Sequence, residues 1–144
     1  QQVEIFEPNQ KILPELKNNI RDLENCTLHE TALGDTSGSV SMEYETHSGT
    51  NHIKDTNGNI TLKTLDSYKF NDVDIIKIDA EGYEIPVLEG ARKTILENRP
   101  WIQVEGNKSG KRYGRTKRDI NIFLKDMGMT RVIKKWPDQV WTFE

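Results

Sequence analysis

A short apolar run at residues 73–79 constrains the fold of this chain more than any other feature. Its Val and Ile side chains would occupy both faces of a strand, as in a parallel sheet covered on both sides. Apolar residues then recur at helical spacing from Ile85 to Leu96, and Pro100 ends that periodicity. We therefore predict a central, buried strand followed by a helix over residues 85–98, the repeating unit of an α/β sheet.

Shorter signals place the remaining elements around this unit. They predict, in chain order, a strand at 3–6, a helix at 12–25, a strand at 26–33, an antiparallel excursion with strands at 40–44 and 60–65, a strand at 101–105, a helix at 117–127 and a hairpin of strands 130–134 and 139–143. Thr116 and Asp119 form a capping box for the last helix, and the polar residues 46–59 are expected to be mobile. This order predicts one mostly parallel α/β sheet with a C-terminal antiparallel hairpin.

Length and charge bear on the classes of partner. The 144 residues fit one domain spanning residues 1–144, and 20 basic against 23 acidic residues give a net charge of -3. We therefore expect neither nucleic acid nor an anionic membrane as a partner. No apolar stretch reaches the roughly 20 residues of a membrane span. The single cysteine, Cys26, permits no internal disulfide, so we expect a cytoplasmic protein.

One local charge cluster departs from this balance. Its basic residues are Lys108, Lys111, Arg112, Arg115, Lys117 and Arg118. Such a run is typical of a solvated loop, and it is also able to bind a phosphate-bearing substrate. The sequence leaves both interpretations open.

Several motifs carry a resemblance to a known family. Residues 3–9 read VEIFEPN, residues 74–84 read DIIKIDAEGYE, and residues 87–91 read VLEGA. The tripeptide TLD at 64–66 and the pair VE at 104–105 match in order and approximate distance. In these segments the chain resembles the FkbM family of class I S-adenosylmethionine-dependent methyltransferases.

The resemblance implies a Rossmann-like class I methyltransferase fold with a site for S-adenosylmethionine across the carboxyl ends of the central strands. Glu7, with Pro8 and Asn9, would lie at the ribose, and Ala32 and Leu33 would flank the adenine. Each has a structural alternative. Glu7 also suits the first turn of a helix, Asn9 a helix cap, and the two apolar residues a core.

Three acids crowd the junction after the strand at 73–79, beside Gly82. The resemblance places Asp79 at the amino-acid moiety of the cofactor or at the reacting methyl group. We predict Glu81 as the base on the acceptor hydroxyl, with helix capping as the alternative for either residue. Glu105, after the next strand, would face the same site, either orienting the acceptor or pairing with a basic loop residue. Glu84 is the third acid of the junction.

No metal is expected, because the three histidines have no metal-ligand spacing. They are His29, His47 and His52. The predicted function is O-methylation of a hydroxyl on a small molecule or carbohydrate, namely a sugar, glycan or secondary metabolite. The alternative is a non-catalytic Rossmann-like binding or assembly module.

The Gly-rich turn that usually holds the cofactor is not found in this sequence. We therefore expect the chain to begin after the first strand and that turn of the family's domain. On its own it should bind S-adenosylmethionine weakly and be inactive. A missing strand would also leave an exposed sheet edge, through which a homodimer could form.

Overall fold

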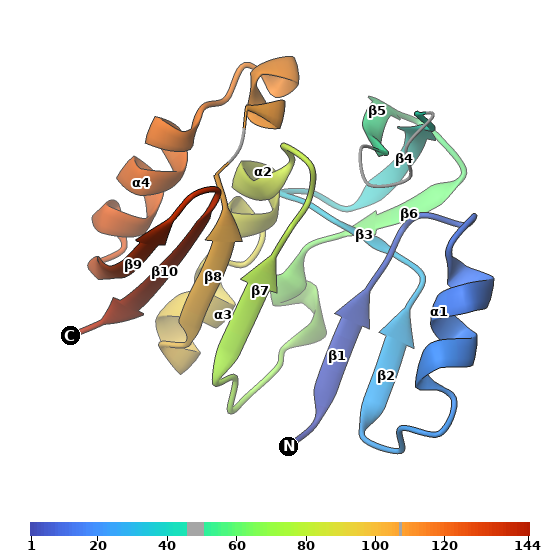
Figure 1. Cartoon of the computed structure of the whole chain (residues 1–144), viewed down its shortest axis with the longest axis horizontal. Helices are drawn as coiled ribbons and strands as arrows, with labels where there is room; N and C mark the ends of the chain where they lie inside the picture. Colours follow the sequence, from blue (N-terminus) through green and yellow to red (C-terminus); the bar gives the residue numbers. More distant parts are fainter. Residues whose placement is uncertain (46–50, 107) are drawn as a thin grey trace.

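The computed structural model describes residues 1–45, 51–106 and 108–144 and shows a mixed α/β fold, as predicted (Figure 1). The elements are β1 (Val3–Phe6), α1 (Leu13–Ile20), β2 (Cys26–His29), β3 (Ala32–Leu33), β4 (Gly38–Glu43), β5 (His52–Thr56), β6 (Ile60–Lys63), η2 (Leu65–Tyr68), β7 (Ile75–Ile78), α2 (Glu84–Glu89), α3 (Arg92–Asn98), β8 (Trp101–Glu105), η3 (Ser109–Tyr113), α4 (Lys117–Asp126), β9 (Met129–Lys135) and β10 (Asp138–Phe143). Three separate sheets replace the single sheet that the sequence predicted. No helix of the described residues is long and apolar enough to cross a membrane.

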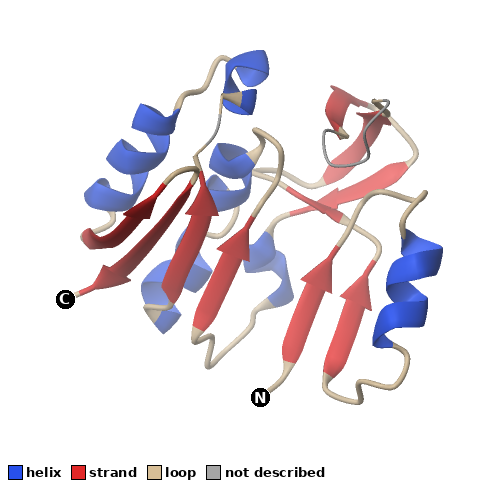
Figure 2. Ribbon diagram, in the orientation of Figure 1, coloured by secondary structure: helices blue, strands red, loops and turns tan. Residues whose placement is uncertain are grey.

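The largest core lies under the sheet β7-β8-β10-β9. β7 and β8 are parallel, β10 runs antiparallel to β8, and the predicted hairpin of β9 and β10 is confirmed. Helices α2, α3 and α4 cover one face of this sheet (Figure 2). Ile102, Val104 and Trp141 from the sheet are fully buried with Leu88 and Leu124 from the helices.

The prediction that residues 73–79 form a central strand buried on both faces is wrong. β7 is an edge strand that pairs with β8 alone among the described residues. Its side chains alternate, so that Ile78 lies in the core whereas Ile75 is 69% exposed and Trp101 beside it is 49% exposed. The unpaired edge agrees with the exposed edge expected from the sequence, and a homodimer through it stays a prediction.

A parallel pair, β1-β2, lies beside β7, with its strands pointing the same way as β7 and β8 (Figure 1). Side chains join this pair to the rest of the molecule through an aromatic cluster. Phe6 stacks on His29 with ring centroids 4.5 Å apart, and Tyr68 stacks on Phe70 at 5.5 Å. Phe6 also meets Tyr68 edge to face at 5.0 Å. The carboxyl ends of β1 and β7 therefore lie on the same side of the molecule.

The strand predicted over residues 26–33 is divided in the structure. β2 ends at His29, and β3 pairs with β6 in a different sheet. The division follows burial, because Ala32 is 1% exposed and packs in a second hydrophobic cluster with Val40, Ile60 and Leu62. Joining that cluster takes residues 32–33 away from β1.

The predicted antiparallel excursion is confirmed as the sheet β3-β6-β4-β5, in which β4 runs antiparallel to both β5 and β6. β5 is an additional strand that lies within the stretch expected to be mobile. Residues 46–50, including His47, and residue 107 lie outside the described residues.

The helix predicted over residues 85–98 is split into α2 and α3. A Cβ atom at Gly90 would lie 1.9 Å from the carbonyl oxygen of Gly34, so only glycine permits this approach. The carboxylate of Asp66 accepts hydrogen bonds from the backbone N–H groups of Lys93 at 3.0 Å and Thr94 at 2.8 Å, which caps α3 separately. The predicted capping box of Thr116 and Asp119 at α4 is confirmed.

Candidate active site

The turn that joins β7 to α2 holds the acidic motif in a constrained backbone conformation. Glu81 has φ of 49° and Gly82 has φ of 103°. A Cβ atom at Gly82 would lie 2.5 Å from the carbonyl carbon of Ser109, so the turn packs backbone to backbone against η3. Glycine is required here by both the dihedral angle and the contact.

Glu84 anchors this turn from inside. Its side chain is 3% exposed, and its Oε1 accepts hydrogen bonds from Gly82 N at 2.9 Å and Ala80 N at 3.3 Å. Burial raises the pKa of Glu84, and the backbone donors lower it by a smaller amount. Of the three acids in the motif, Glu84 is therefore the one with a structural role.

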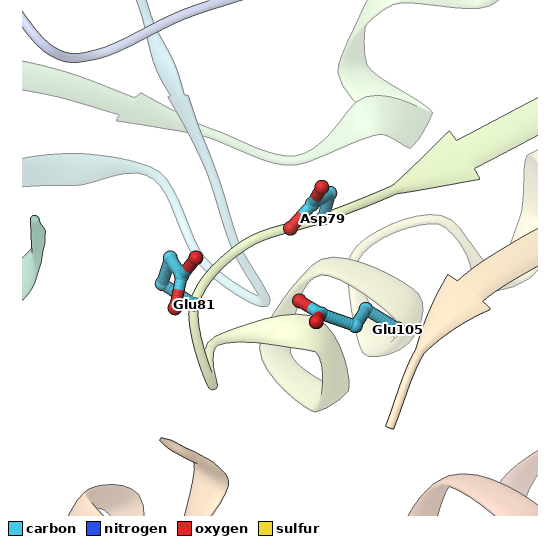
Figure 3. A group of neighbouring side chains, drawn as sticks. All are labelled: Asp79, Glu81 and Glu105. Carbon is cyan, nitrogen blue, oxygen red and sulfur yellow. The ribbon is translucent and has the colours of Figure 1, made fainter. Parts of the chain in front are cut away.

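The other two acids meet a third from the neighbouring strand. Asp79, Glu81 and Glu105 each offer a carboxylate oxygen, and these oxygens lie within 4.8 Å of one another (Figure 3). Asp79 and Glu105 lie at the carboxyl ends of two adjacent parallel strands, which accounts for their approach. We call these three residues the acid site.

Two glutamates of the acid site, Glu81 and Glu105, have pKa values above those of ordinary carboxyl groups. Burial, a side-chain hydrogen bond to Asp79 and the nearby negative charges raise the pKa of Glu105 to about 7. Burial, followed by the charges of Asp79 and Glu84, also raises the pKa of Glu81, and the positive charge of Arg112 partly offsets this. Carboxyl groups that titrate close to neutral pH are suited to general acid and base chemistry.

The same three oxygens are close enough to bind one divalent cation, because hard cations prefer carboxylate ligands. Without a cation, the three carboxyl groups can also lie this close together if they share protons, because protonation removes the repulsion between them. The expectation that the site works without a metal stays a prediction.

Glu7 and Asn9 lie just beyond the carboxyl end of β1. Oε1 of Glu7 accepts a hydrogen bond from Asn9 N at 2.7 Å, and no described residue bonds its second carboxylate oxygen. Burial raises the pKa of Glu7. The Asn9 side chain is 3% exposed, and its Oδ1 accepts from Lys11 N at 3.0 Å, so it caps the turn before α1. Pro8 lies between them, half-buried.

Ala32 and Leu33 differ in what they offer to a ligand. Ala32 is enclosed in its own hydrophobic cluster, as the core alternative described. Leu33 is half-buried and packs against the main core, so it has apolar surface left to present. Their contact with adenine stays a prediction.

Arg112 is a site residue that the sequence did not single out. Its Nη1 donates a hydrogen bond to the carbonyl oxygen of Glu81 at 3.1 Å, so η3 supports the acidic turn directly. The signal for it was the basic run, but nothing in that run distinguished Arg112 from its neighbours. Asp66 of the TLD motif also proves to be a helix cap.

A family model for the methyltransferase FkbM domain matches residues 2–129. The chain belongs to the FkbM methyltransferase family. The crystal structure of methyltransferase FkbM from Methylobacillus flagellatus KT superposes on this FkbM domain with a TM-score of 0.67 and 19% sequence identity. The match covers 99% of the present chain and 36% of that protein, and at this identity it shows the fold alone. No curated protein matches.

Proposed function

We propose that this FkbM domain methylates a hydroxyl group of a sugar, glycan or secondary metabolite in a reaction that uses S-adenosylmethionine. The gathering of the acid site at the ends of two parallel strands carries this proposal. Two of its carboxyl groups have raised pKa values, as a base working near neutral pH requires. A binding module has no evident need for such a group.

The residues present fit the ribose and adenine parts of S-adenosylmethionine. Glu7 offers a half-buried carboxylate with an oxygen that no described residue bonds, which suits a ribose diol. Leu33 offers apolar surface for the adenine, with Pro8 and Asn9 completing the turn beside Glu7. When bound, the cofactor supplies a methyl group on a sulfonium, which is intrinsically reactive.

The residues of the chain then position the acceptor and take up its proton. Glu81 is the base that removes the hydroxyl proton, and its raised pKa makes it a stronger proton acceptor than an ordinary glutamate. Glu105 and Asp79 share a hydrogen bond beside it, which limits the negative charge around the reacting oxygen. Asp79 is also the group proposed to contact the amino-acid moiety of the cofactor.

The test uses the full coding sequence that contains this domain, with labelled S-adenosylmethionine and a panel of hydroxyl acceptors. Glu81→Gln should lower kcat by roughly a hundredfold to ten-thousandfold while leaving the Kd for the cofactor nearly unchanged. Asp79→Asn should raise that Kd as well. Glu97→Gln, on the exposed side of α3, is the control of equal charge change.

Two results would count against the proposal. Near wild-type turnover by the Glu81→Gln protein would remove Glu81 as the base and leave Glu105 as the candidate. Cofactor binding without methyl transfer to any hydroxyl acceptor would favour the non-catalytic binding module.

A further inference from the structure

Two hollows on the surface differ in charge. The larger, about 520 Å³, has both signs in its lining, with Lys125 and Arg131 near Glu144. The smaller, about 200 Å³, lies between η3, the start of α4 and the turn from β9 to β10. We call it the basic hollow, and its lining includes Lys108, Lys111, Arg115, Lys117, Gly106 and Trp136.

The positive charge of the basic hollow is largely uncompensated. None of the described residues that line it is acidic. Among the described residues, no acid forms an ion pair with Lys108, Lys111 or Lys117, and Arg115 meets Glu89 only at 3.6 Å. In a chain with a net charge of -3, this is a local concentration of cations that would attract an anion.

Lys117 in the hollow is also close to positive charges on β9. Its Nζ lies 4.6 Å from the ring centroid of Trp136, a residue that is 62% exposed. Burial and the positive charges of Lys134 and Arg131 lower the pKa of Lys117. A bound anion would relieve this repulsion, and the exposed indole provides an apolar surface beside it for the remainder of a ligand.

An unsatisfied donor lies next to Gly106, one of the residues that line the basic hollow. Gln139 is fully buried, its Oε1 accepts a hydrogen bond from Arg131, and its Nε2 has no partner among the described residues. A Cβ atom at Gly106 would lie 2.6 Å from that Nε2 and 3.1 Å from Cγ of Lys117. A buried N–H donor without an acceptor is rare, and the lack of a side chain at Gly106 places this donor directly behind a residue that lines the hollow.

Two short connections along the chain link the basic hollow to the acid site. Gly106 directly follows Glu105 in the chain, and Arg112, next to Lys111, bonds the carbonyl oxygen of Glu81. One ligand of modest size could therefore place an anionic group in the hollow and a hydroxyl at Glu81.

We propose that the basic hollow binds the phosphate group of a phosphorylated methyl acceptor, of which a sugar phosphate is the simplest kind. Four cations suit a dianion better than a single carboxylate, and lysines are effective phosphate ligands. This inference rests on the proposed function, because it assigns to that acceptor a second binding group.

Binding is tested first, by two-dimensional ¹H–¹⁵N NMR of the chain. Glucose 6-phosphate should shift the Gln139 side-chain amide and the Trp136 indole signals saturably, with inorganic phosphate weaker and glucose without effect. The double variant Lys108→Gln/Lys111→Gln should weaken glucose 6-phosphate binding at least tenfold, because each substitution removes a charged contact with the phosphate. Lys93→Gln removes one positive charge from the exposed side of α3, outside the hollow, and should change affinity less than twofold.

Three results would overturn the proposal. They are equal shifts with glucose, unchanged affinity in the double variant, and tighter binding of a short single-stranded oligonucleotide than of glucose 6-phosphate. Glucuronate binding as tightly as glucose 6-phosphate would also contradict the choice of phosphate.

Methyl transfer separates this proposal from the one on which it rests. In the full coding sequence, the double variant should raise the KM of a phosphorylated acceptor at least tenfold without changing the Kd for S-adenosylmethionine. Transfer to neutral acceptors that is indifferent to the lysines would refute the phosphate site and leave the proposed function standing. Phosphate binding without any methyl transfer would refute the proposed function and leave the phosphate site standing.

Discussion

The acid site and the basic hollow are neighbours, yet the fold builds them by different means. The acids depend on a turn with two positive φ angles, a buried Glu84 and a backbone contact with η3. The lysines at 108 and 111 are exposed and reach the hollow with long side chains. Buried side chains and backbone contacts therefore hold the acids close together. The lysines stay near water, where screening weakens the repulsion between their charges. We therefore predict that mutations around the acid site lower the free energy of unfolding strongly, and that mutations in the basic hollow lower it little.

The largest effect on stability is expected for Gly82→Ala. The new Cβ atom would lie 2.5 Å from Ser109 C and 2.6 Å from Ser109 O, backbone atoms that cannot turn aside. We expect a loss of about 3 kcal/mol or more in the free energy of unfolding, measured by urea denaturation.

Gly114→Ala is the matched control for that variant. Gly114 also has a positive φ, of 69°, but no atom lies within 4 Å of its added Cβ. We expect a loss of about 1 kcal/mol from the dihedral angle alone. Equal losses in the two variants would show that the contact with η3 is unimportant.

Glu84→Ala should be the next most damaging change. It leaves the N–H groups of Gly82 and Ala80 without their acceptor, at a cost of about 2 to 3 kcal/mol. Glu84→Gln should cost less, because the amide oxygen still accepts and the buried charge is gone. If Gln destabilises the chain as much as Ala, the hydrogen bonds are not what Glu84 contributes.

A smaller, pH-dependent effect is expected for Glu105→Gln. The pKa of Glu105 rises from 4.5 to about 7 on folding, so the folded state holds the proton more tightly than the unfolded state. The stability from that proton is present below pH 4.5 and is lost as the pH rises through about 7. In thermal unfolding, the variant should therefore gain stability relative to wild type as the pH rises from 4.5 to about 7. A difference that does not change with pH would contradict the shifted pKa.

The least effect on stability is expected in the basic hollow. Lys108→Gln/Lys111→Gln should change the free energy of unfolding by no more than about 0.5 kcal/mol, because neither ammonium group has an acidic partner among the described residues. The same variant should carry the largest loss of phosphate affinity. A loss of stability as large as that of Glu84→Ala would remove the contrast between the two regions.

The parts of the fold that the sequence predicted are those with local causes. The hairpin follows from two alternating segments around a turn, and α4 from the capping box at Thr116. The errors concern contacts between distant segments. The split between α2 and α3 depends on Gly34 reaching Gly90, and the division of residues 26–33 depends on a second hydrophobic cluster. Neither partner is visible from the local pattern.

In the candidate site, too, the features with local causes were predicted and those that depend on tertiary contacts were not. Glu105 was expected beside Asp79 because adjacent parallel strands end at one edge, and the structure brings them together. The buried position of the Glu84 side chain was not predicted, since it depends on the backbone conformation at Gly82 and on packing against distant segments. The basic run was visible, but its convergence with Trp136 required the position of the β9–β10 turn.

The contact of Gly82 with Ser109 and Gly110 has a further consequence for acceptor choice. Because backbone packs directly on backbone, the offset between the β7–α2 turn and η3 has little freedom to vary. An acceptor that engages Glu81 and the lysines together must then match that offset with its own length. If both proposals hold, acceptors would be selected by the number of bonds between their phosphate and hydroxyl groups.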